Sequence, residues 1–370
     1  MSKADRPGRS RAGGRTGGDA GSAGSAGSAA DAGSVVDGGS VVDGGSVVDG
    51  GSVVDGGDAV NGGDAVNGGD AVNGEKGAGR VPARLAVRKT YKLYIGGAFP
   101  RSESGRSYAV ASSSGDFLAN ASRASRKDAR DAVSAARKAF GGWSGATAYN
   151  RGQILYRVAE MLEGRRAQFV AELADTGAGR AGDTGQAERI VDAAVDRLVW
   201  YAGWSDKIAA VAGSSNPVAG PYFNISSPEP TGVVAVIAPD EPLLGLVSVL
   251  APVIVTGNTC VVVASERAPL PSITLAEVLA TSDLPGGVVN ILTGSVAELA
   301  PWLSAHMDVN ALDLTGVTDE RLAVTCEEAA SENLKRVLRP AATTDWYADP
   351  GTRRLTAFLE TKTVWHPTGV

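Results

Sequence analysis

The hydrophobic pattern is densest in residues 229–266, where two short apolar runs flank a longer one. Residues 232–238 are apolar without polar alternation, which is typical of a central strand in a parallel sheet that is covered on both faces. Residues 243–256 are long enough for a helix, Gly257 suits a helix C-terminus, and residues 259–263 are β-branched or small. This stretch therefore predicts one βαβ unit.

The alternation of helices and strands continues after this unit. We expect helices at residues 272–281, 296–305 and 319–330, and strands at residues 288–292, 311–314 and 334–338. Such an order predicts an α/β fold with a doubly wound, Rossmann-like parallel sheet.

Three amphipathic helices are expected before the central unit. The first begins after Ser125, a suitable N-cap with Asp128 three residues on, and its pattern ends at Gly141. The others are predicted at residues 150–173 and 186–211. The last contains the aromatic cluster WYAGW, which at helical spacing favours core packing over a platform for a ligand.

Residues 1–84 form a low-complexity tail. SVVDGG occurs four times from Ser34, and DAVNGG repeats follow from Asp58. Each copy has two glycines and little apolar surface, so the free energy gained by burying that surface does not offset the loss of conformational entropy on ordering the chain. We expect a disordered linker; a hexapeptide β-helix or a Ca²⁺-binding repeat is the alternative.

Composition excludes several functional classes. The 370 residues carry a net charge of -6 and a pI near 5.2, which argues against nucleic acid or a membrane surface as partner. No apolar run reaches the roughly 18 residues of a membrane span, and the N-terminus lacks the apolar core of a secretory signal. Two distant cysteines form no disulfide framework. These features predict a cytoplasmic protein.

Several motifs resemble aldehyde dehydrogenases. In the central unit they are the strand GVVAVI, a proline-containing turn, a helix with LAP, then TGNT and a valine run; DAVSAARKAFGGW precedes them, and NLKRV and ETKTV follow. The resemblance implies an NAD(P)-dependent family member in truncated form. It divides the chain into a cofactor-binding domain at 85–340 with an arm strand at 221–230, a linker at 341–353 in place of the catalytic domain, and a C-terminal oligomerisation strand at 354–370.

The resemblance also implies that the catalytic residues are missing. The family's nucleophilic cysteine belongs to the absent domain, and neither Cys260 nor Cys326 is expected to replace it. The turn that carries the family's oxyanion-binding asparagine here holds Asp240 and Glu241, and Pro340 stands at the position of the general-base glutamate. The two acids are predicted to form a solvated turn, with an acid/base pair or metal ligands as alternatives. We therefore expect no catalytic residue and no metal site.

The family's cofactor contacts are kept only in part. Lys-Pro-x-Glu becomes Val-Ala-Ser-Glu at 263–266, and Phe-Thr-Gly-Ser becomes Leu-Thr-Gly-Val at 314–317, so a ribose contact and a phosphate-binding hydroxyl are lost. The residues at matching positions, which the resemblance assigns to NAD(P), are Pro239, Glu266, Gly294, Thr315 and Gly316. Weakened NAD(P) binding is expected.

Three functions remain open. The first is an inactive structural or regulatory subunit that assembles with a full-length aldehyde dehydrogenase, because in the family the arm of one subunit adds a strand to its neighbour's catalytic sheet. The second is an NAD(P)-dependent oxidoreductase acting on the aldehyde or oxo group of donors. The third is a ligand-binding or scaffold module that uses the nucleotide cleft or the N-terminal tail.

Overall fold

The computed structural model describes residues 87–177, 183–339 and 343–369. The predicted tail and its hexapeptide repeats lie outside these ranges. The described residues all belong to the compact unit of residues 81–370.

A five-stranded parallel sheet forms the centre of this unit. The strand order is β7-β6-β5-β8-β9. From β5 the chain adds β6 and β7 on one side and then β8 and β9 on the other, with all strands parallel, so the predicted doubly wound topology is confirmed. The strands are β5 (Val233–Ile237), β6 (Thr259–Val263), β7 (Val289–Leu292), β8 (Ala311–Asp313) and β9 (Arg336–Leu338).

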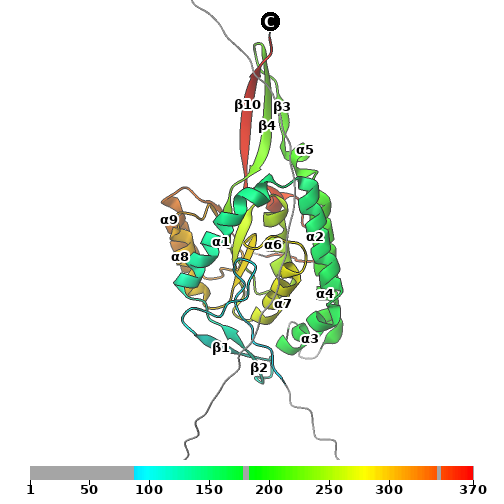
Figure 1. The fold of residues 1–370 in the computed structure, drawn as a ribbon, viewed down its shortest axis with the longest axis vertical. Coiled ribbons are helices and arrows are strands. Elements are labelled where there is room, and N and C mark those ends of the chain that lie inside the picture. Colours follow the sequence, from blue (N-terminus) through cyan, green and yellow to red (C-terminus); the bar gives the residue numbers. More distant parts are fainter. Residues whose placement is uncertain (1–86, 178–182, 340–342, 370) are drawn as a thin grey trace, which may run out of the picture. The chain divides into compact units, whose positions relative to one another are not determined.

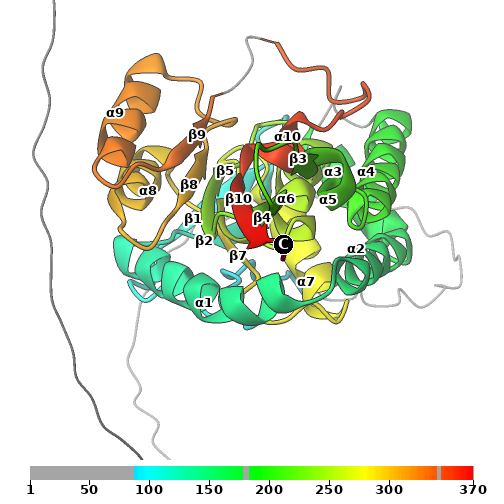
Figure 2. The ribbon, with the colours of Figure 1, turned by 90° about the horizontal axis from the view of Figure 1, so that it is seen from above.

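Helices bury both faces of the sheet, as the unbroken apolar strands predict. Alternate residues of β5 point to opposite faces: Val233 packs with α1 (Arg126–Gly145), α8 (Val296–Ala305) and α9 (Glu320–Ser331). Val234 packs on the side of α6 (Leu244–Val255) and α7 (Pro269–Ala280). Figure 2 shows α8 and α9 on one side of the sheet and α2 and α4 on the other.

The first helix has the predicted start but a different end. Ser125 caps α1 and forms a capping box with Asp128, as expected. The prediction that the helix ends at Gly141 is wrong, because α1 continues to Gly145. The extra turn buries Trp143, whose Nε1 donates to the carbonyl of Ile254 at 2.8 Å. Tertiary packing here outweighs the low helix propensity of glycine.

The other two predicted helices are each divided in the structure. Residues 150–173 belong to α2 (Ala148–Glu163) and α3 (Arg166–Thr176), separated at Gly164, and residues 186–211 belong to α4 (Thr184–Trp204) and α5 (Ile208–Ala212). The aromatic cluster packs as core: Tyr201 is fully buried, Trp200 is half-buried against it, and Trp204 is half-buried beside Trp200.

A separate three-stranded antiparallel sheet projects from the body (Figure 1). We call it the arm. It consists of β3 (Ser214–Asn216), β4 (Tyr222–Pro230) and β10 (Leu359–Pro367) in the order β10-β4-β3, and β4 and β10 pair along nine residues each. The short helix α10 (Arg353–Ala357) precedes β10, and Asn258 Nδ2 donates to the carbonyl of Phe358 at 3.0 Å, which fastens the base of the arm to the central unit.

A small hairpin of β1 (Ser107–Ala111) and β2 (Phe117–Ser122) completes the described part. Among the helices of these residues, none combines the length and the apolar character that crossing a bilayer requires.

Candidate cofactor cleft

The five residues assigned to NAD(P) all follow the carboxyl ends of parallel strands, which is the edge where open α/β sheets bind ligands. They are Pro239 after β5, Glu266 after β6, Gly294 after β7, and Thr315 and Gly316 after β8. We call the four loops at this edge, residues 238–243, 264–268, 293–295 and 314–319, the cofactor cleft, after the place where open α/β sheets hold their ligands. The sequence therefore placed these residues at one edge of the sheet, and their role in binding stays a prediction.

The turn after β5 contains a buried proline and two acids with different surroundings. Asp240 is exposed, and its Oδ1 accepts from Ser265 Oγ at 2.7 Å. Glu241 is half-buried, and burial raises the pKa of its carboxyl above the ordinary value. Within the described ranges, no group of three or more histidine, cysteine or acidic side chains is arranged to hold a metal ion.

Glu266 reaches across to the next loop. Its Oε1 accepts from the backbone N–H of Val296 at 2.6 Å, so the carboxylate lies at the first turn of α8. This position suits a negative charge, because the first amides of a helix lack intrahelical partners and carry a partial positive charge.

The two glycines of the set allow close backbone contacts. A Cβ on Gly316 would clash with the carbonyl oxygen of Ala238, and the N–H of Gly316 donates to the carbonyl of Ile237 at 2.8 Å. Gly294 has a φ of +135° and lies against Ala124. Gly316 therefore allows the loops after β5 and β8 to meet, and Gly294 allows the loop after β7 to pass close to Ala124.

The segment between β8 and α9 differs from a phosphate-binding loop. Val317 is buried in the core on the α8 and α9 side of the sheet, so the position of the family's serine offers no hydroxyl. The helix starts beyond it, with Asp319 as N-cap, and the Asp319 carboxylate accepts from the N–H of Arg321 at 2.9 Å.

Thr315 forms hydrogen bonds to both members of a buried ion pair, Asp313 and Arg354, which the sequence did not predict. Asp313, at the end of β8, is fully buried and accepts from Thr315 N at 3.0 Å and from Arg354 Nη1 at 2.8 Å. Arg354 Nη2 also donates to Thr315 Oγ1 at 3.0 Å. Burial raises the pKa of the Asp313 carboxyl above its ordinary value, and the charge of Arg354 opposes that rise.

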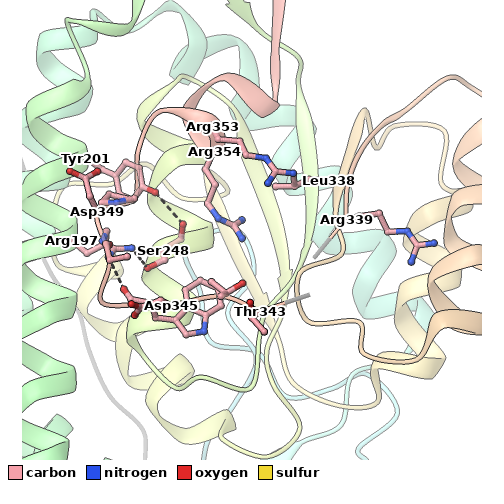
Figure 3. Close-up of a pocket in the computed structure, with 14 residues that line it drawn as sticks. Arg197, Tyr201, Ser248, Leu338, Arg339, Thr343, Asp345, Asp349, Arg353 and Arg354 are labelled. Atoms are coloured by element: carbon pink, nitrogen blue, oxygen red, sulfur yellow. Dashed lines mark hydrogen bonds between the residues drawn. The ribbon is translucent and has the colours of Figure 1, made fainter. Parts of the chain in front are cut away.

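Residues 343–353, which we call the strap, pack against the body beside this ion pair. Arg197 of α4 donates to Ser248 Oγ at 2.8 Å and to the strap carbonyls of Trp346 at 2.7 Å and Ala348 at 3.0 Å. A cavity of about 260 Å³ lies between the strap and α4. Figure 3 shows Arg197, Ser248 and Arg354 among the side chains that line it. No sequence signal predicts these contacts, because Arg197 and its strap partners lie about 150 residues apart.

Both thiols lie in the core. Cys260 on β6 and Cys326 on α9 have no exposed surface, and burial raises the pKa of each. Such surroundings favour the neutral thiol over the thiolate that nucleophilic attack needs.

Comparison with known proteins identifies the family. The model of the aldehyde dehydrogenase family matches residues 99–339. "Aldehyde dehydrogenase, cytosolic 1" of Elephantulus edwardii is 33% identical over 268 residues, which cover 70% of this chain and 52% of that protein. An aldehyde dehydrogenase of Alternaria alternata is 33% identical, with 66% of this chain and 49% of that protein covered.

Solved structures agree. The NAD⁺ complex of an aldehyde dehydrogenase from Bacillus cereus superposes with a TM-score of 0.63 at 28% identity, covering 67% of this chain and 50% of that one. An NAD-dependent aldehyde dehydrogenase from Sinorhizobium meliloti gives a TM-score of 0.63 at 26% identity, covering 70% of this chain and 51% of that one. This chain spans about half the length of the relatives that it matches. It belongs to the aldehyde dehydrogenase family.

Proposed function

We propose that the chain is a catalytically inactive subunit that assembles with a full-length aldehyde dehydrogenase through its arm. The observation that carries this proposal is an asymmetry. The chain keeps the arm, in which β4 and β10 pair along nine residues each. At the place in the sequence where the family has its catalytic domain, the chain has only the short segment that contains the strap.

The surroundings of the remaining polar groups support inactivity. Aldehyde oxidation in this family uses a cysteine thiolate, which adds to the aldehyde to form a thiohemiacetal, and donors that hold the resulting oxyanion. Both thiols of this chain are buried, which raises the pKa of each, and the turn after β5 presents Asp240 and Glu241, whose carboxylates repel a developing oxyanion.

The arm has the features of a surface that adds a strand to a partner. β10 is an edge strand in the order β10-β4-β3, so one row of its backbone groups faces away from β4. Tyr222 and Trp365 are 46% and 56% exposed, with ring centroids 5.7 Å apart, and Phe223 is 48% exposed. Such a strand gains main-chain hydrogen bonds and buries aromatic area on pairing with the edge of another sheet.

This proposal predicts a complex that depends on the arm. The chain co-expressed with a full-length aldehyde dehydrogenase from the same source should elute with it at a defined stoichiometry in size-exclusion chromatography with light scattering. Trp365→Glu should weaken the complex by about tenfold or more, because aromatic anchors carry much of the energy of an interface.

Tyr149→Glu is the matched control, because Tyr149 is an exposed aromatic residue on α2, outside the arm. It should leave the complex intact. Separate elution of the two proteins, or equal loss with both variants, would contradict assembly through the arm.

An NAD(P)-dependent oxidoreductase is the second candidate, and the retained Glu266 and Thr315–Gly316 positions favour it. Its test is turnover: aldehyde-dependent NADH formation by the purified chain, abolished by substituting Glu266 or Cys260, would replace the first proposal.

A further inference from the structure

We infer that the chain's own carboxylates close the cofactor cleft to NAD(P). Aldehyde dehydrogenases of this fold bind NAD⁺, as the Bacillus cereus complex shows for that protein. The residues at the corresponding edge of this sheet do not fit a dinucleotide, for three separate reasons. The inference stands whether or not the chain assembles with a partner.

The first reason lies at the start of α9. A helix N-terminus binds phosphate through amides that lack intrahelical partners. In α9 the N–H of Arg321 already donates to the Asp319 carboxylate at 2.9 Å. A pyrophosphate at this helix start would lose that amide and approach a fixed negative charge. Val317, buried just before, supplies no hydroxyl in compensation.

The second reason is the same arrangement at α8. Glu266 places Oε1 at 2.6 Å from the backbone nitrogen of Val296. One oxygen of the carboxylate that the resemblance assigns to a ribose is thereby engaged by the protein itself, which leaves Oε2 for a ribose hydroxyl. A ribose hydroxyl at Oε1 would have to compete with a charge-assisted hydrogen bond at a helix N-terminus.

The third reason is the charge of the cleft as a whole. Its four loops hold four acids and one arginine, namely Asp240, Glu241, Glu266, Asp319 and Arg267. The arginine lies 3.6 Å from Asp240, so part of its charge is already compensated. Sites for phosphorylated ligands need the opposite balance, since negative charges in a cleft lower the local concentration of an anionic ligand.

Titration with NADH and NADPH, followed by nucleotide fluorescence, tests this inference. The wild-type chain should show no saturable binding up to about 1 mM. The double variant Glu266→Gln, Asp319→Ser should bind at least about tenfold more tightly, because both anions are removed while serine remains a good N-cap. Micromolar binding by the wild-type chain would overturn the inference.

Asp131→Asn provides the matched control. Asp131 is an exposed acid on α1, outside the cofactor cleft, so its loss changes net charge without opening the cleft. A double variant that binds no better than Asp131→Asn would also overturn the inference. If circular dichroism shows that the double variant is unfolded, Glu266→Gln alone is titrated, because α9 and its cap are then untouched; a gain supports the inference and no gain contradicts it.

Assembly and nucleotide binding can fail independently. If the chain forms the complex with a full-length aldehyde dehydrogenase but also binds NADH tightly, only the inference of a closed cleft is refuted. If the chain binds no NADH and forms no complex, only the proposed subunit role is refuted.

Discussion

At the scale of single residues, the Asp313–Arg354 pair explains how a carboxylate is tolerated in the core. Asp313 has no exposed surface and accepts three hydrogen bonds, two from Thr315 and one from Arg354. Removing a charge from water is costly, and pairing compensates only in part. The raised pKa of Asp313 is the measurable consequence.

This pair predicts a pH dependence of stability. Because the folded pKa of Asp313 lies above its unfolded value near 3.8, the folded state keeps a proton that the unfolded state has released. The free energy of unfolding of the wild type, relative to Asp313→Asn, should fall as the pH rises from about 3.8 to the folded pKa of Asp313, and should level off above that pKa. Its slope is at most about 1.4 kcal/mol per pH unit.

Urea unfolding of both proteins across this pH range measures the difference. The amide introduced by Asp313→Asn does not titrate, so the groups that the two proteins share cancel. A relative stability that rises with pH would mean that Arg354 depresses the pKa of Asp313, contrary to this account.

At the scale of elements, the loops after β5 and β8 are locked together by a backbone contact. A Cβ on Gly316 would clash with the carbonyl oxygen of Ala238, where only backbone can move to relieve the overlap. Gly316→Ala should therefore destabilise the fold by about 3 kcal/mol or more.

Gly142→Ala is the control for this substitution, since nothing lies within 4 Å of the added Cβ and the position is helical. It should raise the free energy of unfolding by about 0.5–1 kcal/mol. Equal effects of the two changes in denaturant unfolding would rule out the close approach of the two loops.

Elements were predictable where local pattern decides them. The strand β5 and the helix α6 follow from apolar and mostly apolar runs that end just before Pro239 and Gly257, and β6 follows from the β-branched run after them. β3 was not predicted, because Ser-Ser-Asn is polar and becomes a strand only through pairing with β4. The helix at residues 150–173 was predicted as one because its apolar spacing continues across the break at Gly164.

The candidate site, too, was predictable from the sequence in its position but not in its contacts. Strand ends follow from the sequence pattern, so the shared edge of Glu266 and Thr315 was predictable. The bonds that these residues make were not, because Glu266 meets Val296 thirty residues on and Thr315 meets Arg354 thirty-nine residues on. Such contacts are set by the packed fold, which a single sequence does not specify locally.

At the scale of the whole molecule, a doubly wound α/β sheet is joined to an arm, and both thiols of the described residues are buried. The edge of β10 and the exposed aromatic residues beside it offer a surface to which a partner strand can add. The proposed role in assembly follows from this combination.

The most direct test of that role is native mass analysis of the chain purified at low salt from its own cells. We predict a stoichiometric complex with a full-length aldehyde dehydrogenase. A lone monomer, or a homodimer without any full-length relative, would contradict the account.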